Sequence, residues 1–223
     1  MGGLIIQRSG LHASHISTEL YRSCMQLSEE ARSLLVQNEG MKRLGLNAQV
    51  LAAQTGSQGR ALEVIVSDIG RLSIAIRDIL GTLGESAKTL SETSIEMLHL
   101  AHLKSGYDKG LARGIGPENG DLYGRAHSGV RARARRHRQA LKQRLRAVSG
   151  QVEDLGRIAQ QVLPVTTMIR IVVVDADSKA GELLGAVDEL KSFHANLDAK
   201  VERMREIHEI CFQYIQAMDK EDR

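Results

Sequence analysis

Residues 46–72, LNAQVLAAQTGSQGRALEVIVSDIGRL, decide the fold of this 223-residue chain. Gly56 and Gly59 bracket Ser57 and Gln58, and glycine accepts the backbone conformations that a tight reversal requires. Helix-favouring residues lie on both sides of these glycines. The stretch therefore predicts two helices that fold back on each other around a turn near 56–59.

Apolar or small residues recur every seven positions on both sides of this turn, as in helices that pack through a heptad seam. Before the turn they are Leu20, Leu27, Leu34, Met41 and Ala48, interleaved with Cys24, Ala31, Asn38, Gly45 and Ala52. After the turn they are Leu62, Ile69, Ile76, Leu83, Leu90 and Met97, interleaved with Ile65, Leu72, Ile79, Ser86, Thr93 and Leu100. Because Asn38 is polar at a core position, we interpret it as a residue that fixes helix register.

The same repeat returns in the second half of the chain and predicts two further helices. Its positions include Leu141, Val148, Leu155, Val162 and Ile169, followed by Leu183, Leu190, Leu197, Met204, Cys211 and Met218. Pro164 lies inside the third helix and predicts a bend or a local break near 162–166, because proline removes a backbone hydrogen bond. Residues 171–174, IVVV, are predicted as helix because a strand there would have no partner.

The periodicity predicts an all-α fold, a long antiparallel four-helix coiled-coil bundle with helices of similar length. Residues 1–104 form the first helical hairpin, with its turn near 56–59. Residues 105–124, with six glycines, are expected to be a connecting loop. Residues 125–223 form the second hairpin, with its turn near 177–181. The chain would then be one bundle, a pseudo-dimer of two fused hairpins.

The composition supports this fold and limits the class of function. Only 3% of the residues are aromatic and none is tryptophan, so the core must be built from aliphatic side chains. A net charge of +3 gives no general case for nucleic-acid binding. The two distant cysteines fit a reducing compartment, and no apolar run reaches the length of a transmembrane segment. We therefore expect a cytoplasmic protein.

Residues 47–72 resemble the cytoplasmic signalling tip of bacterial methyl-accepting chemotaxis receptors, whose pattern is N-A-x-I-x-A-A-x-x-G-x-x-G-R-G-F-x-V-V-A-x-E-I-x-x-L. The matching positions are Asn47, Ala48, Val50, Ala52, Ala53, Gly56, Gly59, Arg60, Leu62, Val64, Ile65, Asp68, Ile69 and Leu72. The resemblance implies a hairpin that pairs with a second hairpin. Leu51, Gln54 and Ser57 replace charged residues that, in the family, help to contact the histidine kinase and its coupling protein.

The first functional hypothesis is a non-catalytic, chemoreceptor-like protein that serves signalling or assembly through protein–protein contacts at the hairpin tip. The resemblance implies a chemotaxis histidine kinase, its coupling protein or other receptors as partners. We expect no cofactor. The expected partner-binding residues are Leu46, Asn47, Val50, Gln54, Gly56, Gly59 and Arg60.

The second hypothesis is a sensor that binds a metal, haem or another small ligand through histidine and cysteine. Cys24, His208 and Cys211 occupy seam positions, so one layer of the bundle could hold a metal or form a redox pair. Other histidines are expected at one end of the bundle, but they fall outside the seam and need not converge. They are His12, His15, His99, His102 and His137.

The third hypothesis is a scaffold that binds an acidic partner through residues 131–146, RARARRHRQALKQRLR. Its basic patch comprises Arg131, Arg133, Arg135, Arg136 and Arg138. The alternative is a solvated helix end that pairs with Asp219, Glu221 and Asp222. Because no aromatic residues are interleaved with the arginines, we expect no specific nucleic-acid recognition.

Overall fold

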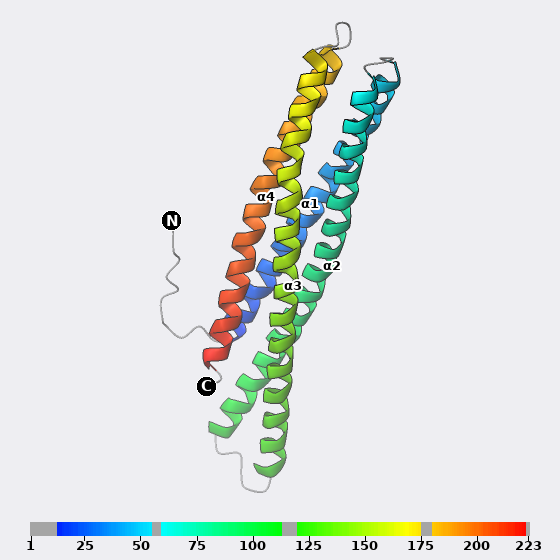
Figure 1. Cartoon of the computed structure of the whole chain (residues 1–223). Coiled ribbons are helices and arrows are strands. Elements are labelled where there is room, and N and C mark those ends of the chain that lie inside the picture. The colour runs from blue at the N-terminus through cyan, green and yellow to red at the C-terminus, as the bar shows by residue number, and fades with distance from the viewer. Residues whose placement is uncertain (1–12, 55–58, 113–119, 175–179, 222–223) are drawn as a thin grey trace. The chain divides into compact units, whose positions relative to one another are not determined.

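A computed structural model describes residues 13–54, 59–112, 120–174 and 180–221, and every residue in these ranges is helical. The helices are α1 (Ala13–Gln54), α2 (Gly59–Ala112), α3 (Gly120–Val174) and α4 (Ala180–Glu221) (Figure 1). Throughout the described ranges the fold is all-α, as the sequence predicts. The turns expected near 56–59 and 177–181 fall largely on residues outside these ranges.

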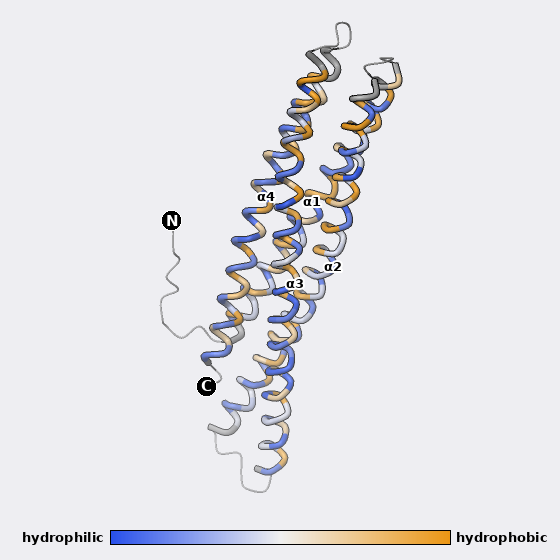
Figure 2. Tube along the Cα trace, in the orientation of Figure 1, coloured by the Kyte–Doolittle hydropathy of each residue, from blue (hydrophilic) through white to orange (hydrophobic). Residues whose placement is uncertain are grey.

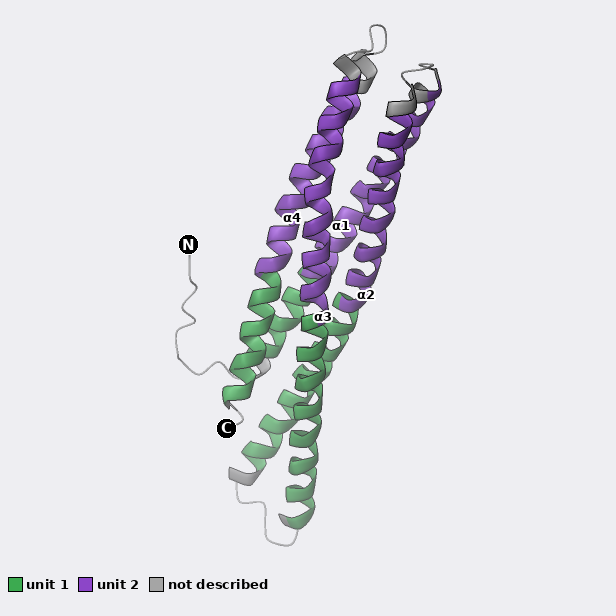
Figure 3. Cartoon of the chain, in the orientation of Figure 1, with its two compact units in different colours: residues 1–26, 87–146, 207–223 green, residues 27–86, 147–206 purple. Residues whose placement is uncertain are grey.

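The four antiparallel helices form a bundle that divides into two compact units, each built from one segment of every helix (Figure 3). Unit 1 comprises residues 1–26, 87–146 and 207–223, and unit 2 comprises residues 27–86 and 147–206. The division does not follow the two predicted hairpins, because residues of both hairpins pack together within each unit.

The predicted heptad positions form the core of both units. Hydrophobic and hydrophilic residues alternate along every helix (Figure 2). The buried seam positions include Leu20, Leu27, Leu34, Ile69, Ile76, Leu83, Leu90, Leu141, Val148, Leu155, Leu190, Leu197 and Met204. In α2 one row differs from the prediction, since Leu80 and Ala87 are buried where Ile79 and Ser86 were expected. An α-helix drifts relative to a strict seven-residue repeat, which moves the buried row by one residue.

Helices α2 and α3 extend into the predicted loop 105–124, so the expected loop boundaries are too wide. The two helices contain 54 and 55 residues, whereas α1 and α4 contain 42 each, so the helices are less similar in length than predicted. The ring of Tyr107 in α2 packs edge-on against Tyr123 in α3, with centroids 5.0 Å apart. This contact supports helical backbone where the glycines alone favour a loop.

Helix α3 continues through Pro164, so the expected local break does not occur. The hydroxyl groups of Thr166 and Thr167 donate to the carbonyl of Leu163 at 2.6 and 3.2 Å. The core contacts of Val162, Val165 and Ile169, all buried, hold the helix on both sides of the proline. Residues 171–174 are helical, as predicted.

Asn38 is a polar residue inside the core of unit 2, only 2% exposed. Its amide nitrogen donates to the carbonyl of Ser73 in α2 at 2.8 Å. Its Oδ1 atom is buried and has no hydrogen-bond partner among the described residues. The side chain thus fixes the register of α1 against α2 at the cost of one unpaired acceptor.

Replacing Asn38 with leucine is expected to raise the free energy of unfolding by about 1 kcal/mol, because leucine removes the unpaired acceptor and fills the core. Urea denaturation followed by circular dichroism measures this change. Asn38→Ala is the control, since it removes the same amide without filling its volume and should destabilise the protein. A lower stability for Asn38→Leu would mean that the hydrogen bond to Ser73 outweighs the unpaired oxygen.

Candidate functional site

Three of the predicted tip residues share one exposed face of α1 close to its end. Leu46 and Val50 lie one helical turn apart and are 54% and 58% exposed. Asn47 is exposed between them. Gly56 and the side chains of Gln54 and Arg60 lie outside the described residues, and Gly59 is described only as the first residue of α2. The described part of the tip is therefore an apolar pair with a neighbouring amide.

Unit 2 carries further exposed apolar residues outside the predicted tip. Val64 in α2 is 64% exposed, and Ile171 in α3 is 64% exposed. Leu163, Met168 and Leu184 are also exposed. These residues could be found in the sequence as large apolar residues outside the heptad seam. The seam positions are buried, so apolar residues elsewhere on the helices are expected to be exposed.

The basic run does not form the single patch that the third hypothesis requires. Arg133, Arg135 and Arg136 are exposed, but Arg138 is only 5% exposed. Its guanidinium donates to the carbonyl of Met218 in α4 at 2.6 Å and lies 3.8 Å from the carboxylate of Asp219. Including Arg138 in the patch was therefore wrong.

Two neighbours of Arg138 also bind other helices. Lys142 forms an ion pair with Asp219, and Arg144 donates to the carbonyl of Thr89 in α2 at 3.2 Å. The predicted pairing of the run with the acidic end of α4 is confirmed for Asp219. The run thus has an exposed part and a part that joins helices.

We expect Arg138→Ala to lower the free energy of unfolding by about 1–3 kcal/mol, because it removes a charged donor from a buried backbone carbonyl. Arg136→Ala is the matched control, since Arg136 is exposed and its loss should change stability by less than about 0.5 kcal/mol. Thermal denaturation of both variants tests the difference. Equal effects would contradict a joining role for Arg138.

The structure brings Cys24 and Cys211 together but not His208. Both cysteines are free thiols, completely buried in unit 1. Cys24 Sγ also lies 3.9 Å from the hydroxyl of Ser94. The hydrogen bond with Cys24, together with burial, raises the pKa of the Cys211 thiol far above its usual range. The redox-pair geometry is therefore present in part, as two adjacent buried thiols.

The predicted metal set does not assemble. Nε2 of His208 lies 3.0 Å from the carbonyl of Leu145, so this ring nitrogen faces the backbone of α3. His15, His99 and His102 are exposed, and His137 pairs with Glu96 at 3.0 Å. His12 lies outside the described residues. Within the described ranges, no three His, Cys, Asp or Glu side chains are arranged to hold a metal.

Both thiols are expected to resist a disulfide reagent such as Ellman's reagent in the native protein at pH 8, because neither is exposed. In guanidinium chloride the reagent should titrate two thiols per chain. The absorbance of the released thiolate measures both numbers. Rapid labelling of the native protein would show that this layer opens readily.

Comparisons with known proteins found no family model, no curated protein and no solved structure that matches the chain. Among the described helices, none combines the length and apolar character needed to cross a membrane. The exposed face of α1 and the sequence pattern at 47–72 are the features that bear on function.

Proposed function

We propose that the protein is a non-catalytic, chemoreceptor-like signalling or assembly protein that acts in the cytoplasm through protein–protein contacts at the tip of its first hairpin. The observation that carries this proposal is the exposed face of Leu46, Asn47 and Val50 on α1. The sequence pattern of residues 47–72 supports the same surface.

The face has the properties of a helix that docks on a partner. Leu46 and Val50 present two aliphatic side chains one turn apart, and each is more than half exposed. Complete burial of such a side chain contributes about 1.5–3 kcal/mol. Asn47 adds an amide that can donate or accept a hydrogen bond at the edge of the contact. Two anchors and one polar contact suit a transient signalling interaction.

A chemotaxis histidine kinase with its coupling protein is the partner that the resemblance favours. Leu51, Gln54 and Ser57 replace the charges of the family pattern, so the contact in this protein rests on apolar burial rather than on ion pairs. Salt weakens interactions between exposed charges, but it does not screen contacts between apolar side chains. Binding should therefore persist at high ionic strength.

Val50→Arg is expected to weaken binding to an immobilised kinase and coupling protein at least tenfold, since it places a charge in the apolar contact. Val36→Arg is the matched control, because Val36 lies two heptads earlier on the same helix and is 68% exposed. This control should bind as the unchanged protein does. Surface plasmon resonance at low and high salt gives the affinities, and circular dichroism confirms that both variants fold.

The absence of binding by the unchanged protein would refute the kinase-coupled form of the proposal. An equal loss in Val36→Arg and Val50→Arg would place the contact elsewhere on α1. Binding that disappears at high salt would contradict the apolar contact.

A further inference from the structure

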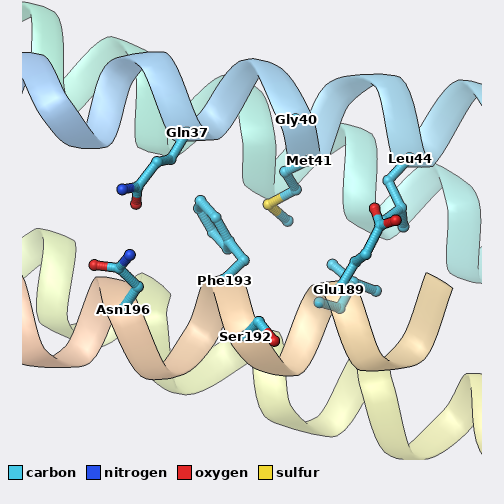
Figure 4. A pocket seen from close by; sticks show the side chains of 9 residues that line it. Gln37, Gly40, Met41, Leu44, Glu189, Ser192, Phe193 and Asn196 are labelled. Carbon is cyan, nitrogen blue, oxygen red and sulfur yellow. The ribbon is translucent and has the colours of Figure 1, made fainter. Parts of the chain in front are cut away.

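A groove of about 300 Å³ opens between α1 and α4 in unit 2 (Figure 4). This volume is at the lower end of the range for small-molecule sites. Helix α1 belongs to the first hairpin and α4 to the second, so a molecule in the groove would contact both. The residues that line it are Gln37, Gly40, Met41, Leu44, Glu189, Leu190, Ser192, Phe193 and Asn196.

The middle of the groove is apolar. Met41, Leu44 and Leu190 are buried and form part of its wall. The ring of Phe193 reaches from α4 towards α1, between Gln37 and Met41 (Figure 4). This ring is half-buried, so part of its surface remains accessible from the groove. Such a wall suits an aromatic or aliphatic group.

Gly40 contributes to the space in the groove because it has no side chain. A Cβ atom added at Gly40 would meet no atom within 4 Å. Glycine in the interior of a helix is less favourable than alanine. A larger residue would fit here and would fill the groove, so position 40 controls its volume without supporting the core.

The two ends of the groove are polar and differ in chemistry. At one end, Oε1 of Gln37 is buried and has no hydrogen-bond partner among the described residues. The amide of Asn196 lies beside it (Figure 4). At the other end, the exposed carboxylate of Glu189 lies near Leu44 (Figure 4). In the described helices, no ion pair involves Glu189, whereas the nearby Asp188 pairs with Lys191 at 3.8 Å.

The distance between these ends limits the length of a ligand. Gln37 and Leu44 are seven residues apart on α1, which corresponds to roughly 10 Å along the helix. A ligand must therefore place a cation and a hydrogen-bond donor on opposite sides of one apolar group. A single aromatic ring with a short aminoalkyl chain has this length.

We propose that the α1–α4 groove binds a small organic cation, an amine whose aromatic body packs on Phe193 and whose far end donates a hydrogen bond to Gln37. The ammonium group pairs with Glu189, and the ring packs against Met41 and occupies the open space beside Gly40. This site is separate from the tip face and does not depend on a protein partner.

A second hollow, of about 480 Å³ between α2 and α3, lacks this chemistry. Its acidic residue, Asp68, already pairs with Arg71 at 2.6 Å. A cation therefore gains less there than beside Glu189, where no such partner competes. The two hollows also differ in the variants that would close them, since Gly40 lines only the first.

Tyramine is the probe for this site, because it carries an ammonium group and a phenol at opposite ends of one ring. Isothermal titration of the full chain should give one site with a dissociation constant on the order of 1 mM or tighter. 4-Hydroxyphenylpropionate, which carries a carboxylate in place of the ammonium, should bind several-fold more weakly, because it loses the ion pair with Glu189 and is repelled by that carboxylate. Phenethylamine, which lacks the phenol hydroxyl, should bind several-fold more weakly than tyramine.

Gly40→Leu should abolish tyramine binding while leaving the melting temperature unchanged or higher, because it fills the groove and favours the helix. Gly81→Leu is the matched control, since Gly81 is also exposed to open space within unit 2 but lies on α2. It should bind tyramine normally. Glu189→Gln should reduce tyramine affinity by about two- to fivefold, as expected for the loss of an exposed ion pair, and should leave the preference for tyramine over phenethylamine unchanged.

Three results would overturn the proposal. The first is no saturable tyramine binding at concentrations well above 1 mM. The second is equal binding of the amine and the carboxylate, which would remove the role of Glu189. The third is unchanged binding by a folded Gly40→Leu variant, which would place tyramine outside this groove.

Discussion

Burial of aliphatic side chains at every third or fourth position is the constraint on which the rest of this structure depends. With 3% aromatic residues, no single side chain can supply a large part of the core. Long runs of leucine, isoleucine, valine and alanine must therefore meet the same kind of run on the neighbouring helices. Every polar group placed in the seam then has a fixed set of neighbours. Asn38 contacts Ser73, and Cys24 contacts Cys211 and Ser94.

Ion pairs between helices favour particular helices as neighbours. Glu30 of α1 pairs with Lys200 and Arg203 of α4 at 2.5 and 2.9 Å, and its side chain is only 13% exposed. Arg205 of α4 pairs with Glu153 of α3 at 3.0 Å. Such pairs contribute little stability individually, but mismatched charges would disfavour other pairings. Within unit 2 the apolar seam drives association, and these pairs select the partner face.

The sequence predicts the helices and most of the core because a heptad repeat is a local property. The burial of Leu34, Leu83 and Leu155 follows directly from it. The boundaries near 105–124 were harder to predict, because the contact between Tyr107 and Tyr123 joins residues on different helices. Arg138 was misassigned for the same reason, since its partner Met218 is distant in sequence. The α1–α4 groove was not predictable, because a seam shows which face is buried but not which helix covers it.

Gly40 keeps the groove open because it has no side chain, but glycine makes α1 less stable than another residue would. Alanine at this position would favour the helix by up to about 1 kcal/mol and would meet no steric obstacle. Consequently, a thermostability screen that ranks variants only by melting temperature would tend to select larger residues at position 40. Engineering of this bundle for heat resistance should therefore keep residue 40 fixed and seek its gains on the exposed glycines elsewhere, such as Gly81 and Gly150.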